Sequence, residues 1–532
     1  MLILHNAVIH TMDPQSPRAS ALVIDNARIQ AVGEDSAILA EYAPASRRRA
    51  TIIQDLSGGV IIPGLIDAHI HLEQYALGQN KVDCETVSRQ ECLRRVAIHV
   101  KRAGPAEWIL GHGWNQNHWP EGFGNASDLD AISGDHPVYL TAKSLHAAWV
   151  NRAALRLAGI HHRTPDPPGG IIQRDIHGEP TGILFESAMQ LVARLVPEPQ
   201  PEQVAQAIQQ AQPLLWRMGI TSVHDFDQRR CFVALQELHD TSRLRLRVVK
   251  SIPLDDLDHA IALGLRSGFG DEFLRIGAVK VFADGALGPR TAAMLAPYQE
   301  DEQNQGLLFL DAEELYEIGR RAVSNGLSLA VHAIGDRANH EVLDAFEQIR
   351  RFERKSRLRL QRHRVEHVQL IHPEDAPRLA GLSLIASMQP IHATSDMLMA
   401  DRYWGARAAY SYAWRIQSEH GAKLAFGSDA PVESPNPFWG LHAAVTRRRL
   451  DGSPGPSGWF PSQRLTVQQG LMAYTSGAAY AAGLEQTCGK LIPGYLADLA
   501  LLDTDPFTCD PDQIKDIQPQ GTMVGGEWVF QC

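Results

Sequence analysis

Two histidines separated by one residue, His69 and His71, end the run Pro63-Gly-Leu-Ile-Asp-Ala-His-Ile-His-Leu72. Alternate residues of a β-strand point to the same face, so both imidazoles project the same way from Cα atoms about 6.6 Å apart. Two imidazoles at that separation can reach one ion at about 2.1 Å. A bare His-x-His is more commonly two histidines of a half-buried strand. Here the preceding apolar run and Pro-Gly, and further histidines and aspartates downstream, favour a metal site.

Three more residues of this kind lie at the ends of later apolar runs. His332 closes Leu327–His332, and His367 closes His363–His367, about one βα repeat further along. Either histidine alone is more often buried with an ordinary hydrogen-bond partner, but the ends of neighbouring strands would bring the two together. Asp429 ends Leu424–Asp429. It is either the capping residue of a turn or a metal ligand that also takes a proton from bound water.

Lys280 lies inside the apolar run Gly277–Gly285. A lysine cation is costly to bury and would repel a metal ion. One interpretation is a salt bridge to Asp284 or to a glutamate. The other is a modified or neutral lysine within the metal site.

The elements that must position these residues are strand-length apolar runs alternating with helical patterns, which is typical of βα units and a parallel sheet. The eight runs are Val60–His71, Ile220–Phe226, Leu244–Ile252, Ile276–Asp284, Leu327–His332, His363–His367, Leu382–Met388 and Leu424–Asp429. They predict an α/β fold, a (β/α)8 TIM-type barrel whose active site lies at the carboxyl ends of the strands. Polar residues recur at those ends: His71, Asp225, Asp284, His332, His367 and Asp429. This recurrence is stronger evidence for a site than any single residue.

The two ends of the chain are rich in short β-patterns, including a Gly525-Gly526 hairpin signal. They predict one small β-sandwich domain formed by both termini. The stretch after the first barrel strand is too long for a loop and contains helical patterns at Arg89–Arg102 and Pro201–Met218. We therefore expect three parts: a sandwich of residues 1–57 and 486–532, a barrel of residues 58–485, and a subdomain inserted over the barrel mouth at 75–215.

Composition excludes several other classes of protein. The formal net charge of -11 in 532 residues argues against a nucleic-acid or anionic-membrane partner, because both require a basic surface. Six scattered cysteines without a Cys-x-x-Cys pair indicate reduced thiols rather than a disulfide framework. No signal peptide and no uninterrupted apolar stretch of about 18 residues is visible. These features predict a cytoplasmic protein that acts on a small-molecule substrate.

Together these segments resemble the amidohydrolase superfamily, in particular its family 3 branch of N-substituted formamide deformylase-like (YtcJ-like) metal-dependent hydrolases. The resemblance covers essentially the whole chain. The motifs that carry it are PGLIDAHIHL, GHGWNQNHWP, GGIIQRDIHGEPTGILFESA, GITSVHD, VKVFADGALGPRTA, VHAIGDRANHEVLDAFE, RVEHVQL, SMQPIHATSD and FGSDAPVESPNPF. Their number and order make the assignment specific.

The resemblance implies a metal-binding barrel with a terminal β-sandwich, in agreement with the pattern of elements, and it implies a homodimer. It implies six metal-site positions: His69, His71, Lys280, His332, His367 and Asp429. In binuclear relatives Lys280 would be carboxylated and bridge two metals. A divalent ion, zinc by preference, would lower the pKa of its bound water and polarise the substrate carbonyl. Asp429 would accept the water's proton and pass it to the departing amine.

Other residues are candidates for the substrate pocket or for supporting the ligands. Trp114, His392, Arg407 and Tyr412 are expected either to line the pocket or to have ordinary packing and surface roles. His146 matches a segment that, by the resemblance, reaches the substrate from the insertion. His224 and Asp225 end the second barrel strand and are candidates for holding a ligand histidine.

The leading functional hypothesis is hydrolysis of a C–N bond in an amide-type substrate, with an N-substituted formamide as one candidate. A second is deamination, or opening of a cyclic amide, on the same centre. A third is a metal-free amidohydrolase-like scaffold for binding or assembly. Such a scaffold should have lost ligands, whereas all six candidate positions are retained.

Overall fold

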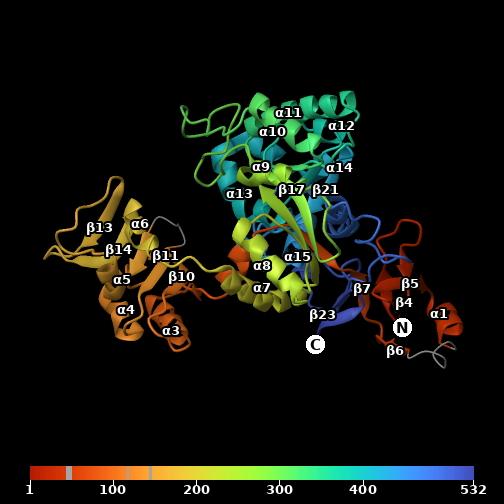
Figure 1. Cartoon of the computed structure of the whole chain (residues 1–532), viewed down its shortest axis with the longest axis horizontal. Helices are drawn as coiled ribbons and strands as arrows, with labels where there is room; N and C mark the ends of the chain where they lie inside the picture. Colours follow the sequence, from red (N-terminus) through yellow and green to blue (C-terminus); the bar gives the residue numbers. More distant parts are fainter. Residues whose placement is uncertain (44–50, 117–118, 143–146) are drawn as a thin grey trace. The chain divides into compact units, whose positions relative to one another are not determined.

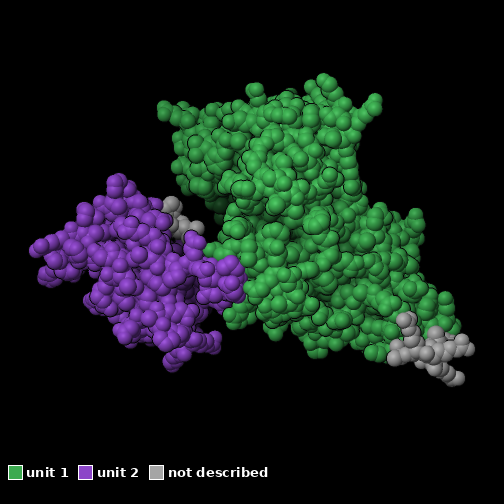
Figure 2. Space-filling view, in the orientation of Figure 1, with its two compact units in different colours: residues 1–75, 204–532 green, residues 76–203 purple. Residues whose placement is uncertain are grey.

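The computed structural model describes residues 1–43, 51–116, 119–142 and 147–532. The described residues form two compact units, one of residues 1–75 with 204–532 and one of residues 76–203 (Figure 2). The first contains a barrel and a β-sandwich, and the second is built on a sheet of its own. Among the described helices, none is both long enough and apolar enough to cross a bilayer.

The barrel of the first unit has eight parallel strands within the described chain, in the order β8-β15-β16-β17-β18-β19-β20-β21. The strands are β8 (Leu65–Ile70), β15 (Ile220–Asp225), β16 (Arg247–Pro253), β17 (Leu274–Phe282), β18 (Leu329–Ala333), β19 (Arg364–His367), β20 (Ile385–Met388) and β21 (Lys423–Phe426). Each of the eight predicted runs overlaps one of these strands. The predicted fold class is therefore confirmed.

Helices follow the barrel strands in the chain (Figure 1). The longer ones are α7 (Pro201–Trp216), α8 (Arg229–Asp240), α10 (Ala312–Ser324), α11 (Asp336–Lys355), α13 (Pro390–Trp404) and α15 (Pro437–Thr446). The shorter ones are α2 (Leu72–Gly78), α9 (Leu257–Ala262), α12 (Arg378–Gly381), α14 (Trp414–Glu419), α16 (Val467–Met472) and α17 (Ala478–Ala481). Every residue of β8, β15, β18, β19 and β20 is buried, as expected for parallel strands covered on both faces.

The first predicted run, Val60–His71, was expected to be one strand and is two. Gly64 divides it into β7 (Val60–Pro63), which joins the sandwich, and β8, which joins the barrel. At Gly64 the backbone passes so close to Thr221 that an added Cβ would lie 2.4 Å from its Oγ1. An apolar run shows burial but not a change of sheet. The one local signal of the break is Pro63-Gly64, a dipeptide typical of turns, inside the run.

The sandwich of the first unit draws on both termini, which lie within it (Figure 1). One described sheet has the order β5-β4-β1-β6 and the other β24-β23-β22-β7-β2-β3. The strands are β1 (Leu2–His5), β2 (Val8–His10), β3 (Arg18–Ala19), β4 (Ala21–Asp25), β5 (Arg28–Gly33), β6 (Ile52–Asp55), β22 (Leu499–Leu502), β23 (Pro519–Val524) and β24 (Glu527–Gln531), with α1 (Asp35–Tyr42) beside them. Gly525 and Gly526 form the predicted hairpin turn, with φ of 57° and 80°.

The second unit has a mixed sheet of order β13-β14-β12-β11-β10-β9. Its strands are β9 (Val82–Asp83), β10 (Ile109–Trp114), β11 (Val138–Ala142), β12 (Ala147–Val150), β13 (Gly170–Arg174) and β14 (Pro180–Glu186). Its helices are α3 (Arg89–Val100), α4 (Ala126–Ser133), α5 (Arg152–Leu157) and α6 (Gln190–Ala193). Most of α7 belongs to the barrel unit, which resumes at Val204. The position of the second unit over the barrel mouth stays a prediction.

Replacing Gly427 by alanine tests the close approach of the segment after β21 to β8, where the barrel closes. An added Cβ would lie 2.3 Å from the backbone nitrogen of His69 and 2.8 Å from Asp67 Oδ1. We expect Gly427→Ala to lower the free energy of unfolding by about 1–3 kcal/mol, because a well-packed site must shift to admit the methyl group. Urea denaturation measures this change. Gly381→Ala is the matched control, because open space surrounds that position; an equal loss in both variants would contradict the packing argument.

Candidate metal centre

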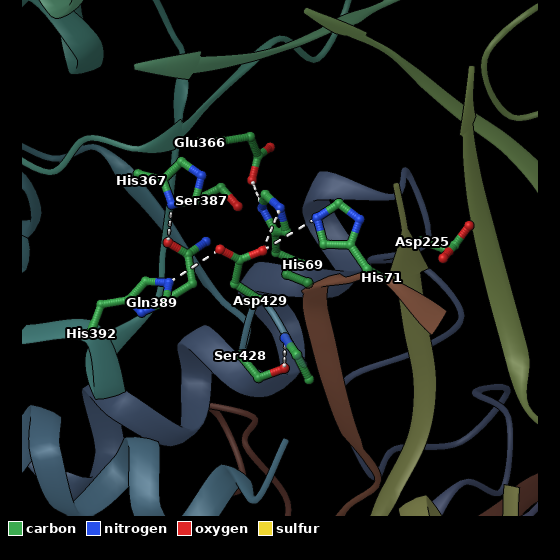
Figure 3. A network of polar contacts seen from close by, with 12 residues as sticks. His69, His71, Asp225, Glu366, His367, Ser387, Gln389, His392, Ser428 and Asp429 are labelled. Carbon is green, nitrogen blue, oxygen red and sulfur yellow. Dashed lines mark hydrogen bonds and ion pairs between the residues drawn. The ribbon is translucent and has the colours of Figure 1, made fainter. Parts of the chain in front are cut away.

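The six predicted metal-site residues come from five barrel strands or the residues just after them. They are His69 and His71 from the end of β8, Lys280 from β17, His332 from β18, His367 from β19 and Asp429, three residues after β21. Figure 3 shows four of them, His69, His71, His367 and Asp429, close together. The strand ends converge because the strands are parallel and in sequence order.

Asp429 stands at the centre of this group. Its Oδ1 lies 3.3 Å from His69 Nε2 and 3.4 Å from His71 Nε2, and its Oδ2 lies 3.2 Å from His392 Nε2. Its φ of 61° is in the left-handed region, which costs free energy for a residue other than glycine. A hydrogen bond of 2.7 Å from its backbone nitrogen to the carbonyl of His69 helps to hold this conformation.

Two groups of potential ligand atoms share this carboxylate. The atoms of His69, His71 and Asp429 lie within 4.8 Å of one another, and so do those of His367, His392 and Asp429. Imidazole nitrogens and carboxylate oxygens are the ligands that zinc and similar divalent ions take in proteins. His392, predicted as a pocket residue, therefore lies against the central carboxylate.

Each of three histidines is held by an acceptor on its Nδ1. His69 Nδ1 is 2.7 Å from Glu366 Oε2, and His71 Nδ1 is 3.2 Å from Asp227 Oδ1. His367 Nδ1 is 2.8 Å from Gln389 Oε1. An acceptor at Nδ1 places the proton there and leaves the lone pair of Nε2 free. The donor set and its orientation therefore fit a divalent cation.

The electrostatic surroundings suit neutral imidazole ligands beside an ionised carboxylate. Burial, and then nearby Lys280, lowers the pKa of His69 to about 4 and that of His332 to about 3. Burial opposes protonation of His71 too, but hydrogen bonds to Asp227 and Asp429 outweigh it and raise the pKa to about 9. Burial would raise the pKa of Asp429, but the surrounding imidazoles hold it well below its usual range. A bound cation would take the place of the proton on His71.

Lys280 is buried without a counter-ion. Its Nζ lies 4.5 Å from the ring centre of Phe226 and 4.9 Å from that of Phe282. No carboxylate of the described chain lies within 4.0 Å of it. Asp284, the predicted salt-bridge partner, instead accepts hydrogen bonds from the backbone nitrogens of Ala293, Ile334 and Gly335. Burial lowers the pKa of Lys280 to about 8, so a substantial fraction of the amine is neutral near that pH.

His332 lies beside His367, on the neighbouring strand. Its Nε2 lies 2.9 Å from the carbonyl oxygen of Gly285, and its ring centre lies 4.6 Å from that of His367. The carbonyl can only accept, so Nε2 carries the proton and Nδ1 is the nitrogen left for a cation.

The remaining pocket candidates in the described residues make packing or loop contacts. Trp114 is in the core of the second unit and donates its indole N–H to the carbonyl of Leu140 at 2.8 Å. Arg407 donates to the carbonyls of Ala296 and Pro297. Tyr412 is buried and donates to Asp396 at 2.6 Å. These are packing and loop-holding contacts, and a pocket role for the three residues stays a prediction. His146 lies outside the described residues.

His224 and Asp225, expected to hold a ligand histidine, lie at the end of β15. The carboxylates that contact His69 and His71 come from other residues. His224 Nδ1 accepts from Arg364 at 2.8 Å, and Asp225 forms an ion pair of 2.9 Å with Lys250. Glu366 and Asp227, which the sequence analysis did not single out, make the direct contacts to His69 and His71. One signal was present: charged Arg364 and Glu366 occupy alternate positions of a short, fully buried strand, so their side chains share one face.

Comparison with known proteins agrees with this geometry. Residues 53–530 match the model of the amidohydrolase family. The chain is 32% identical to the YtcJ protein of Bacillus subtilis (strain 168), over 99% of both chains. It is 27% identical to the N-substituted formamide deformylase of Arthrobacter pascens, over 99% of this chain and 97% of that one. A crystal structure of an uncharacterized metal-dependent hydrolase from Pyrococcus furiosus superposes with a TM-score of 0.79 at 30% identity, covering 95% of this chain and all of that one.

Replacing Glu366 tests whether the carboxylates that contact the histidine Nδ1 atoms strengthen metal binding. Glu366→Gln should weaken zinc binding by about 10- to 100-fold, because the carboxylate that orients His69 and raises its basicity is lost. Asp227→Asn should act in the same direction through His71. Competition with a fluorescent zinc chelator measures both affinities. Asp375→Asn is the matched control, because it removes a buried carboxylate bonded to a distant histidine, His340; equal loss in all three variants would rule out a specific effect.

Proposed function

Because this chain belongs to the amidohydrolase family, we propose that its barrel-mouth site binds one or two divalent ions, zinc by preference, and hydrolyses a C–N bond of a small amide-type substrate. The observation that carries the proposal is the central carboxylate of Asp429, which two groups of histidines share. In three of these histidines, His69, His71 and His367, the contact at Nδ1 leaves the lone pair of Nε2 for a cation. A bound divalent ion supplies activation of a water molecule and polarisation of the substrate carbonyl.

The chain's own residues then have separate roles. His69, His71, His332, His367 and Lys280 would hold the metal, together with Asp429. The carboxylate of Asp429 is ionised and is therefore able to accept the proton of the attacking water. The same carboxylate can deliver that proton to the leaving nitrogen, which must depart as an amine. His392, 3.2 Å from Asp429 Oδ2, fixes the orientation of the carboxylate.

We further propose that Lys280 is carboxylated when metal is bound. The neutral amine attacks carbon dioxide, an N–C bond forms, one proton leaves the nitrogen, and a carbamate anion results. A carbamate turns a cation that would repel a metal into an oxygen ligand. Neighbouring Lys250 is equally buried but is paired with Asp225, which keeps its pKa above the usual value despite burial. Only Lys280 therefore offers a neutral amine near neutral pH.

An N-substituted formamide is the substrate class that we favour. The relative that bears this activity in its name matches nearly the whole of this chain. Deamination or opening of a cyclic amide would use the same centre and the same proton transfers, so only measured rates separate these alternatives. A metal-free scaffold is disfavoured because two groups of histidine nitrogens gather around the carboxylate of Asp429, an arrangement that a binding scaffold does not require.

A substrate screen with controlled metal content tests the proposed reaction. N-formyl amines should be hydrolysed with a kcat/KM at least about tenfold above N-acetyl amines, cyclic amides, esters and amino-heterocycles. Chelation should abolish turnover, and zinc, manganese or cobalt should restore it. Asp429→Asn should lower kcat by about 100- to 10,000-fold, because the proton acceptor is lost, whereas Asp375→Asn should not. A fully folded protein that binds no metal, or turnover that survives chelation, would exclude the proposal.

Labelling with carbon-13 bicarbonate tests the state of Lys280. At a pH of about 8, where roughly half of the amine is neutral without metal, the zinc-loaded protein should show one carbamate carbon resonance. Lys280→Met should lose that resonance, and Lys250→Arg should retain it. A resonance that persists without Lys280, or none in the unaltered protein, would contradict carboxylation at this residue.

A further inference from the structure

A cavity of about 310 Å³ is lined mainly by residues at or before the starts of β17, β18 and β19, and it extends to Ser251 and His224 further along β16 and β15. None of the six candidate metal residues lines it. Its walls include Arg275–Ala278 near the start of β17, Ser328 before β18 and Gln361 before β19. Ala481, Ala482 and Gly483 form another part, where small side chains leave space. The volume is at the lower end of that of small-molecule sites.

The cavity is lined by four arginines and by no aspartate or glutamate. Arg362 is paired with Glu485, and Arg364 with Glu366. For Arg275 and Arg359, in contrast, no carboxylate in the part of the chain that the structure describes lies within 4.0 Å. Asp271 and Glu485 act on Arg275 and Arg359 only from beyond ion-pair distance, so an external anion in the cavity would supply the direct contact that these two guanidinium groups lack.

Buried donors at the cavity also lack partners. Arg275 donates from Nη2 to the carbonyl of Gly268 at 2.8 Å, but its Nε has no hydrogen-bond partner among the described residues. His224 accepts from Arg364 at Nδ1, so its proton is on Nε2, which also has no partner within the described chain. Buried N–H groups without an acceptor are destabilising. Both residues line the cavity, which is the nearest place for an acceptor to enter.

We propose that this cavity is a binding site for a small phosphate-bearing molecule, with Arg275 and Arg359 as its principal anion contacts. A guanidinium presents a planar fork of N–H donors that matches the oxygens of a phosphate. The hydroxyl groups of Ser251, Ser267 and Ser328 lie on the same cavity and add neutral donors. The volume beyond the phosphate would hold an organic part. None of the six candidate metal residues lines this cavity, so the proposal does not rest on the proposed hydrolysis.

Isothermal titration of the zinc-loaded full-length protein with inorganic phosphate tests the site, against chloride at equal ionic strength. We expect one saturable site, and a Kd about tenfold weaker in Arg359→Gln and in Arg275→Gln, because each variant loses a charge-assisted hydrogen bond. Arg359 is exposed, so that variant should keep the fold. Arg320→Gln is the matched control, because Arg320 is an exposed arginine of α10 paired with Glu317, and its Kd should not change.

A steric variant tests the cavity without removing charge. Ala482→Leu fills the space and should also weaken phosphate binding about tenfold or more. Three results would overturn the proposal. The first is the absence of saturable binding up to about 10 mM phosphate. The second is an unchanged Kd in the Arg275→Gln/Arg359→Gln double variant, which would place the anion at the metal. The third is an unchanged Kd in Ala482→Leu. Tighter binding of succinate than of phosphate would overturn the assignment to phosphate.

Discussion

The hydrogen bond between the backbone nitrogen of Asp429 and the carbonyl of His69 is the constraint on which the site depends, because it joins the end of the last barrel strand to the first. A second bond, from His71 nitrogen to the carbonyl of Ala430 at 2.9 Å, continues the same closure. Closing the barrel at this point places the carboxylate of Asp429 beside the histidines of β8. The same bonds hold Asp429 in a backbone conformation that would otherwise be unfavourable.

Two buried carboxylates, those of Glu366 and Asp227, orient the imidazoles of His69 and His71. Glu366 contacts His69 and is itself paired with Arg364, while Asp227 contacts His71. A buried charge without a partner is strongly destabilising, so each of these carboxylates requires its neighbours as much as the histidines require it. The arrangement resembles the carboxylate–histidine pairs that fix ligands around bound metals. The site is therefore a continuous polar network within an otherwise apolar barrel.

The two buried lysines of adjacent strands show how surroundings decide chemistry. Lys250 of β16 has Asp225 at 2.9 Å and remains a cation, whereas Lys280 of β17 has aromatic rings in place of a carboxylate. The cation of Lys280 is therefore disfavoured by burial without full compensation. A residue type alone would not distinguish the two, because both are lysines within apolar strands.

The sequence alone was sufficient to predict the barrel, its eight strands, the sandwich built from both termini and the placement of His69, His71, His332, His367 and Asp429 at or just after strand ends. These features depend on local patterns: apolar runs of strand length, a glycine pair at a hairpin and polar residues where such runs stop. Only the tertiary structure decided that Gly64 divides the first run between two sheets. It also identified Glu366 as the partner of His69, from which it is separated by 297 residues, and it placed Trp114 in a packed core. Contacts between distant residues depend on how strands are brought side by side, and no local pattern records that.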